Sequence, residues 1–185
     1  VLFHNPIFLF LFLPIILFLY YYTFKQSTFA HEYILVTAGI FFYAWWNIYL
    51  TPLIIISIVF NFYFGKLIKN NLDYNSKKKI LIFSIFFNIL YLAIFKYTDF
   101  LIENINYLLN LNINLLNLPF PLAISFVTFQ TIAYLVDCFN GNIKNTRFTQ
   151  YSLFIIFFPQ LIAGPIVKYN FMMSQFDNDN SKIIN

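Results

Sequence analysis

The stretch from Leu118 to Tyr169 reads LPFPLAISFVTFQTIAYLVDCFNGNIKNTRFTQYSLFIIFFPQLIAGPIVKY. It consists of two apolar runs joined by a polar, basic turn. Both runs carry uncharged polar side chains, and the first carries a carboxylic acid near its end. A lipid bilayer does not favour such groups, so their presence calls for a reason. We interpret the two runs as the functional part of the chain and the rest as the membrane scaffold that holds them.

The composition indicates a membrane protein. The chain is 61% hydrophobic and 10% charged over 185 residues, whereas a soluble domain carries about 25% charged residues. Its apolar runs are continuous and do not alternate, which favours helices over a barrel. Because each crossing needs about 20 residues, we predict an all-α, multi-pass membrane helical bundle with about six transmembrane spans.

The predicted spans are the six apolar runs, which cover residues 6–24, 32–49, 53–68, 80–97, 121–139 and 151–167. The first run lacks the basic start and the small-residue cleavage site of a signal peptide, so we interpret it as a retained span. Two runs carry polar stripes at helical spacing that we expect to face other helices. These stripes are Ser57 and Asn61 in the third run, and Ser84, Asn88 and Tyr91 in the fourth.

Residues 98–118 have no clean span length, because Leu and Ile alternate there with Asn. We interpret them as an extracytoplasmic segment that lies on the membrane surface. The single cysteine, Cys138, excludes an intramolecular disulfide.

Basic loops predict the topology. The loop from Lys66 to Lys79 holds five lysines against Asp73, and by the positive-inside rule it is cytoplasmic. We interpret this charge as a topology signal, not as a lipid- or partner-binding site. Counting crossings from it places residues 140–147, with Lys144 and Arg147, on the same side. The prediction is a protein of the cell inner (plasma) membrane with an extracytoplasmic N-terminus. The net charge of +4 therefore indicates no nucleic-acid partner, and membrane lipids are the expected surroundings.

In the fifth run, Gln130, Tyr134 and Asp137 are spaced i, i+4, i+7 and share one helix face, flanked by Ser125 and Thr128. An ionised Asp within a span costs roughly 2.5–3.5 kcal/mol. Two interpretations of Asp137 stand side by side. It lines a pathway or organises a site, or it is a hydrogen-bonded acid that fixes helix packing and can pair with Lys144 or Arg147.

The sixth run is interrupted twice. Pro159 removes a backbone donor and predicts a kink with Gln160 beside it, and Gly164-Pro165 interrupts the run again. Broken backbone at membrane depth persists only where protein or a cavity covers it. We therefore expect this segment at a cavity wall, followed by a short amphipathic helix over Ile166–Phe176.

Three sequence segments resemble the membrane-bound O-acyltransferase (MBOAT) superfamily, and most of all its bacterial alginate O-acetyltransferase branch. They are PLAISFVTFQ (121–130), YLVD (134–137) and FFPQLIAGPIVKY (157–169). The opening FLFLFLPI, which ends at Ile15, and FYAWW (42–46) are also similar. The resemblance extends over nearly the whole chain, with Ala123 where the family more often has Gly.

The resemblance implies transfer of an acyl group from a thioester donor, acetyl-CoA or an acyl carrier, to a hydroxyl. In the alginate branch it implies acetylation of an extracellular polysaccharide, hence alginate biosynthesis, with an extracytoplasmic acetyl-transfer partner protein. No bound cofactor or metal is expected. The candidate substrate-tunnel residues are then Gln130, Tyr134, Asp137, Pro159, Gln160, Gly164 and Pro165.

The family's catalytic histidine, by the same resemblance, belongs to an apolar helix in the second half of the protein. His4 precedes the first run and His31 is expected in a juxtamembrane loop, so neither fits. A hydroxyl that attacks a thioester needs a general base, usually histidine. We therefore expect residues 1–185 to be the N-terminal half of such an enzyme. They would form the N-terminal transmembrane portion of a larger MBOAT-type domain, an incomplete fold that is inactive alone.

Three alternatives stay open from sequence. A related branch of the superfamily transfers D-alanyl groups to teichoic acid, and the sequence does not distinguish that reaction from acetyl transfer. It is also compatible with a catalytically dead remnant. Broken helices and an intramembrane Asp fit a small membrane transporter as well, although no internal repeat is visible.

Overall fold

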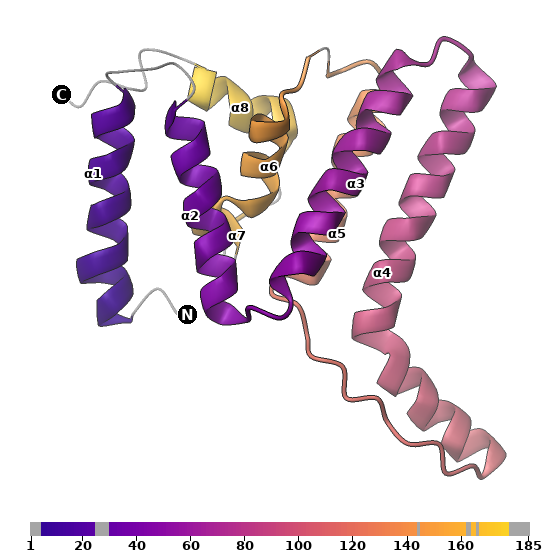
Figure 1. The fold of residues 1–185 in the computed structure, drawn as a ribbon. Coiled ribbons are helices and arrows are strands. Elements are labelled where there is room, and N and C mark those ends of the chain that lie inside the picture. The colour runs from indigo at the N-terminus through magenta and orange to yellow at the C-terminus, as the bar shows by residue number, and fades with distance from the viewer. Residues whose placement is uncertain (1–4, 25–29, 144, 162–163, 166, 178–185) are drawn as a thin grey trace.

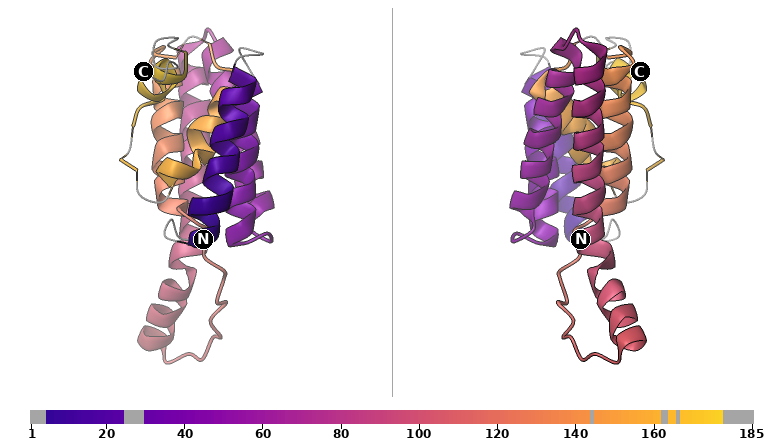
Figure 2. Two further views of the ribbon diagram at one scale, coloured as in Figure 1. Left: turned by 90° about the vertical axis from the view of Figure 1, so that its left-hand side faces the viewer. Right: turned by 90° about the vertical axis from the view of Figure 1, so that its right-hand side faces the viewer.

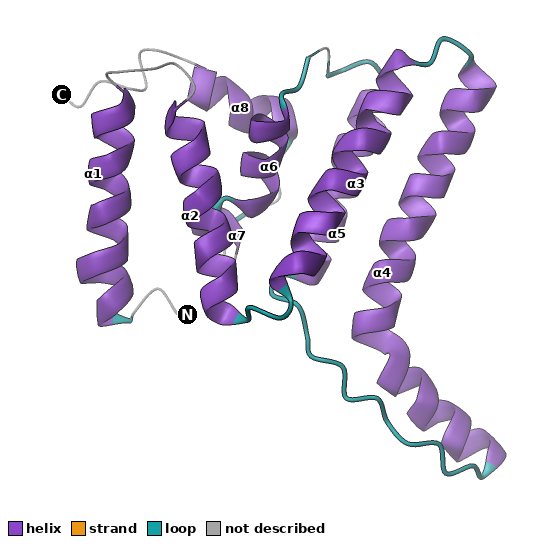
Figure 3. Ribbon diagram, viewed as in Figure 1, coloured by secondary structure: helices purple, strands orange, loops and turns teal. Residues whose placement is uncertain are grey.

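The computed structural model describes residues 5–24, 30–143, 145–161, 164–165 and 167–177. Over these residues the regular structure is all helix, joined by loops, and no strand forms, as predicted (Figure 3). The elements in chain order are the π-helical turn η1 (Phe8–Phe12), α1 (Leu13–Phe24), α2 (Ala30–Trp46), α3 (Thr51–Asn70), α4 (Tyr74–Leu109), α5 (Ile124–Phe139), α6 (Phe148–Ile156), α7 (Phe158–Leu161) and α8 (Tyr169–Asp177).

The helices form a bundle whose long axes run side by side. Helices α1 to α4 follow one another across Figure 1, and α5 packs against both α3 and α4. Helix α6 packs against α2, and α8 lies next to α6 at one end of the bundle. The buried core therefore sits between α2, α3, α5 and α6.

Two helices, α3 and α4, are long and apolar enough to cross a membrane. Residues 8–23 and α5 are apolar but shorter. The predicted runs 6–24, 32–49, 53–68 and 121–139 each coincide with a helix to within a few residues. Length and composition thus support two crossings, and the number six stays a prediction.

The predicted separation of residues 98–118 from the fourth run is wrong, because α4 continues to Leu109 and has 36 residues. At 1.5 Å per residue it is about 54 Å long, and it projects past the other helices (Figure 2). The following extended segment returns along it. The Asp99 carboxylate accepts the backbone N–H groups of Leu116 (2.8 Å) and Asn117 (3.0 Å). These bonds attach the returning segment to the middle of α4.

A pair of buried amides joins α3 to α4. Asn61 Nδ2 donates to Asn88 Oδ1 (3.1 Å), and Asn88 Nδ2 donates to Asn61 Oδ1 (2.7 Å). Each amide also donates to the serine carbonyl one turn before it, Ser57 and Ser84 respectively. The prediction that these two stripes face other helices is confirmed, and they face each other.

The predicted sixth run, 151–167, does not form one continuous helix, as its two interruptions predicted. Helix α6 has nine residues and ends at Ile156. Helix α8 then lies beside the start of α6, where the Tyr169 hydroxyl donates to Gln150 Oε1 (3.4 Å) and Asn170 Nδ2 donates to the Asn142 carbonyl (2.9 Å). The segment therefore enters the bundle and returns to the same end, because Pro159 and Gly164-Pro165 prevent a continuous helix. The short helix expected over Ile166–Phe176 is confirmed as α8.

An ion pair between a buried carboxylate and a half-exposed guanidinium joins the start of α2 to the start of α6. The Arg147 guanidinium donates to Glu32 Oε1, and Thr149 Oγ1 donates to Glu32 Oε2 (2.7 Å). Glu32 is 2% exposed, whereas the side chain of Arg147 is 44% exposed. A buried carboxylate needs a partner, because water cannot hydrate it once the pair is broken. The half-exposed guanidinium can be hydrated instead.

This difference in exposure predicts unequal effects of removing either charge. Arg147→Gln should lower the free energy of unfolding by about 3 kcal/mol, because it leaves a buried carboxylate without its cation. Glu32→Gln should lower it by about 1 kcal/mol, since water can hydrate the half-exposed guanidinium. Denaturant unfolding in detergent measures both, and equal losses would contradict the assignment of Glu32 as the buried partner.

Candidate functional site

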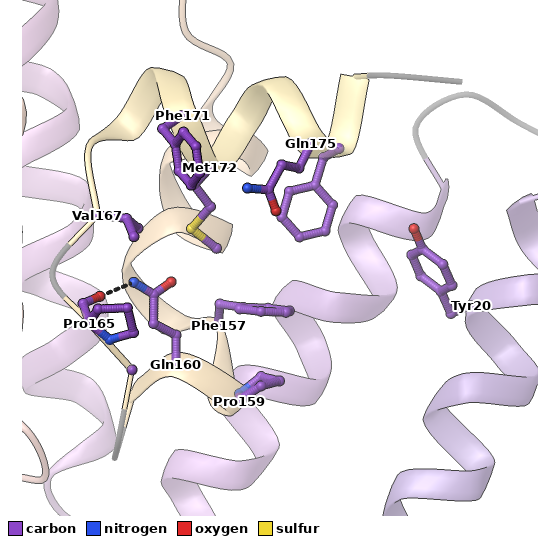
Figure 4. Close-up of a pocket in the computed structure, with 11 residues that line it drawn as sticks. Tyr20, Phe157, Pro159, Gln160, Pro165, Val167, Phe171, Met172 and Gln175 are labelled. Carbon is purple, nitrogen blue, oxygen red and sulfur yellow. Dashed lines mark hydrogen bonds between the residues drawn. The ribbon is translucent and has the colours of Figure 1, made fainter. Parts of the chain in front are cut away.

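The interruption of the sixth run forms one wall of a pocket of about 480 Å³ (Figure 4). Helix α1 contributes Tyr20 to it, and α8 closes the opposite side. The lining residues are Tyr20, Phe157, Pro159, Gln160, Gly164, Pro165, Val167, Phe171, Met172, Gln175 and Phe176. A neighbouring apolar pocket of about 240 Å³ shares Tyr20, Phe157, Pro159 and Phe176 with it, so the two adjoin.

The interruption itself is a tight reversal of the backbone. Phe157 leaves the helical conformation (ψ 100°) and ends α6. Its carbonyl then accepts the N–H groups of Gln160 and Leu161, both at 3.0 Å, which starts the single turn of α7. Pro159 has no N–H, so it fits inside this turn without leaving a donor unpaired.

Gln160 attaches the next segment to this turn through two hydrogen bonds. The side-chain Nε2 donates to the Pro165 carbonyl (2.9 Å), as Figure 4 shows. The backbone carbonyl of Gln160 accepts the Gly164 N–H (2.9 Å). A Cβ on Gly164 would lie 2.2 Å from Gln160 Cγ and 2.8 Å from its carbonyl oxygen. Glycine at 164 is therefore what allows the segment to close onto Gln160.

The backbone of α2 packs directly on the end of α6. A Cβ on Gly39 would lie 2.3 Å from the Ile156 carbonyl oxygen, so no larger residue fits there without a backbone shift. This close contact covers the last residue before the interruption with protein, as broken backbone at membrane depth requires. The role of Gly39 was not visible in the sequence, since nothing links it to a residue more than a hundred positions away.

Four of the seven predicted tunnel residues meet at the pocket, namely Pro159, Gln160, Gly164 and Pro165. Gln130 and Tyr134 do not line it. They lie in the core between α3, α5 and α6, where the Tyr134 ring packs 4.4 Å from that of Tyr151. Neither amide atom of the fully buried Gln130 has a hydrogen-bond partner within the described residues. A role for these two in substrate handling stays a prediction.

Asp137 lies at the end of α5, also outside the pocket lining. Its Oδ1 accepts from Asn142 Nδ2 (2.9 Å) and its carbonyl accepts the Asn142 N–H (3.0 Å), so it organises the turn after α5. Of the two partners considered for it, Arg147 forms its ion pair with Glu32 instead. Lys144, the other expected partner, lies outside the described residues. The contacts show a hydrogen-bonded acid in the turn after its own helix, and the choice between the two interpretations of Asp137 stays open.

The two histidines were expected outside apolar helices. His4 lies outside the described residues. For His31 the expectation is wrong, since it is in the first turn of α2, is 2% exposed, and packs edge-on against the Tyr20 ring at 5.8 Å. It contacts a pocket residue without lining the pocket. Sequence reasoning missed this burial because it started the second run at residue 32, two residues after α2 begins.

The chemistry of the pocket is that of binding. Its described lining offers amide groups from Gln160 and Gln175, one phenol and apolar walls, with no imidazole, carboxylate or amine. An amide nitrogen carries two N–H donors, and Gln160 gives one of them to Pro165. Such a site can hold a neutral polar group, but its lining supplies no general base. Among the described residues, no group of three side chains could hold a metal ion.

Comparison with known proteins finds relatives over the whole chain. It is 36% identical to a peptidoglycan O-acetyltransferase of Helicobacter pylori across all of this chain and 40% of the relative. Probable alginate O-acetylases of Azotobacter vinelandii and Pseudomonas aeruginosa are 31% and 30% identical, over 95% of this chain and 36% and 34% of their own lengths. A teichoic acid D-alanyltransferase of Lacticaseibacillus rhamnosus is 30% identical over 30% of this chain.

The chain thus spans well under half the length of the O-acetylating relatives, less than the half expected from the sequence. No family model matches it, and no solved structure does. The homologues and the two apolar helices together identify a membrane protein.

The contacts of Gln160 predict that the segment around Gly164 opens more often when the Gln160 side-chain amide is removed. In Gln160→Leu, which replaces the amide by an apolar side chain one atom shorter, the amide hydrogen of Gly164 should exchange about fivefold faster, because one hydrogen bond of about 1 kcal/mol no longer holds the segment. Site-resolved hydrogen exchange in detergent measures it.

Met172→Leu is the matched control, since it changes another lining residue at nearly constant volume. Its exchange rate at Gly164 should stay at the wild-type value. Equal rates in the wild type and Gln160→Leu would show that the side chain does not hold the segment.

Proposed function

This chain belongs to the MBOAT superfamily, and we propose that it forms the acyl-donor-binding part of a membrane-bound O-acetyltransferase. The observation that carries the proposal is the match of the entire chain, at 36% identity, to an O-acetyltransferase. The interrupted helix adds a physical reason, because it holds a neutral hydrogen-bond donor at the wall of an otherwise apolar pocket.

The pocket suits an acetyl thioester, from acetyl-CoA or an acyl carrier. The carbonyl of a thioester is uncharged, so it needs a hydrogen-bond donor but no counter-charge. The second N–H of Gln160 can donate to that oxygen while the first stays bonded to Pro165. A donor aimed at a carbonyl stabilises the negative charge that develops on attack.

We propose an extracellular polysaccharide as the acceptor, of the alginate O-acetyltransferase type, reached with an extracytoplasmic partner protein. Relatives named for O-acetylation cover 95% or more of this chain, whereas the relative named for D-alanyl transfer covers 30%. That contrast favours acetyl transfer over D-alanyl transfer to teichoic acid. A transporter is less well supported, because Asp137 is bonded within its own turn and lies outside the pocket lining.

The proposed topology places the basic loops in the cytoplasm of a plasma-membrane protein with an extracytoplasmic N-terminus. Both basic loops lie at one end of the bundle, where Lys69 Nζ donates to Thr146 Oγ1 (3.2 Å). This common position supports the positive-inside argument. Helix α8 lies at the same end, so the pocket beneath it would be reached by a thioester donor from the cytoplasm.

We expect no acetyl transfer by the purified 185-residue chain, because its described pocket holds no general base. A longer polypeptide that contains this chain and continues past Asn185 should transfer acetyl groups from a thioester to a polysaccharide. In that polypeptide, Gln160→Leu should lower kcat/KM about tenfold at unchanged expression, and Met172→Leu should stay within about twofold.

Turnover by the 185-residue chain alone would refute the proposal of a binding portion. Equal losses in expression and activity for Gln160→Leu would assign Gln160 to packing. The absence of transfer from any thioester by the longer polypeptide would end the acyltransferase proposal.

A further inference from the structure

A second pocket, of about 200 Å³, lies at the end of the bundle that carries the basic loops. It sits between the last turns of α3 and the segment that leads into α6. Its lining residues are Phe62, Lys66, Lys69, Asn70, Asn145 and Thr146. We call it the lysine pocket. It shares no lining residue with the pocket at the interrupted helix.

The lysine pocket holds two positive charges without a carboxylate. Within the described residues the ion pair recorded is that of Arg147 and Glu32, so neither Lys66 nor Lys69 has an acidic partner within 4 Å there. Lys69 is half-buried, and its Nζ donates to the Thr146 hydroxyl at 3.2 Å. An ammonium has three N–H donors, so the hydroxyl bond leaves capacity for an anion.

Lysines near a helix C-terminus are expected on other grounds, because they interact favourably with the last carbonyl groups. The hydrogen bond to Thr146 argues for more than this at Lys69. It directs the ammonium across the pocket, towards a segment 77 residues further along the chain. Lys66, which also lines the pocket, is exposed. The like charges of two lysines at one pocket repel each other, and an anion bound there relieves that repulsion.

The uncharged groups of the pocket match one class of anion. The Thr146 hydroxyl and the side-chain amides of Asn70 and Asn145 can donate to oxygens. A phosphate group accepts several such bonds at once and binds strongly to ammonium groups. We propose that the lysine pocket binds a phosphate ester. At the end of an apolar helix, the ester can come from a phospholipid headgroup or from a soluble phosphorylated molecule.

The test measures binding of phosphate esters to the 185-residue chain in detergent. The lipid probe is short-chain phosphatidylglycerol, the soluble probe is glycerol 3-phosphate, and short-chain diacylglycerol is the uncharged control. Lys66→Gln and Lys69→Gln should each weaken binding about fivefold, since one lysine near a phosphate is worth about 1 kcal/mol. Lys78→Gln, exposed in the same basic region but outside the pocket, should stay within about twofold.

Binding of phosphatidylglycerol alone with this pattern of variants would identify a headgroup site. Binding of glycerol 3-phosphate with the same pattern would identify a site for soluble esters. Either supports the proposal. Equal weakening by Lys78→Gln, equal binding of diacylglycerol, or no binding of either phosphate probe would overturn it. Helical circular dichroism confirms that each variant is folded, and no outcome depends on acyl transfer.

Discussion

Where a helix is interrupted inside an apolar bundle, backbone N–H and C=O groups lose their helical partners and must be covered by protein. The rest of this structure depends on that constraint. The sixth apolar run stops at Phe157 and turns back. On one side, the backbone of α2 at Gly39 lies so close to Ile156 that an added Cβ would clash with the Ile156 carbonyl oxygen. On the other, Gln160 binds the returning segment at Pro165. A pocket with one polar wall results from this arrangement.

Polar contacts hold the scaffold in place according to their surroundings. Uncharged amides join α3 to α4, where Asn61 and Asn88 satisfy each other without placing an ion in the bundle. The charged pair of Glu32 and Arg147 lies at the end of the bundle, where half of the arginine still reaches water. Neutral groups in the interior and charges at its ends are what a low-dielectric surrounding permits.

Sequence reasoning could predict the helices and the interruption, because apolar runs and proline act locally. It could not predict which neighbours a helix face meets. Gln130 and Tyr134 do share a face, but that face packs on the core and not on the pocket. The pairing of Glu32 with Arg147 joins residues 115 positions apart, and Asp99 in α4 binds the backbone of Leu116 and Asn117, which follow the helix. Such contacts follow from tertiary packing alone.

The interrupted helix should face a protein-walled pocket and not lipid. Spin labels at positions 160 and 129 test it in bilayers, in a Cys138→Ser background that removes the single native thiol. Phe129 is 54% exposed on the outer face of α5. The label at 129 should collide mainly with lipid-dissolved oxygen, and the label at 160 mainly with a water-soluble nickel complex or with neither. An oxygen-dominated signal at 160 equal to that at 129 would contradict the account.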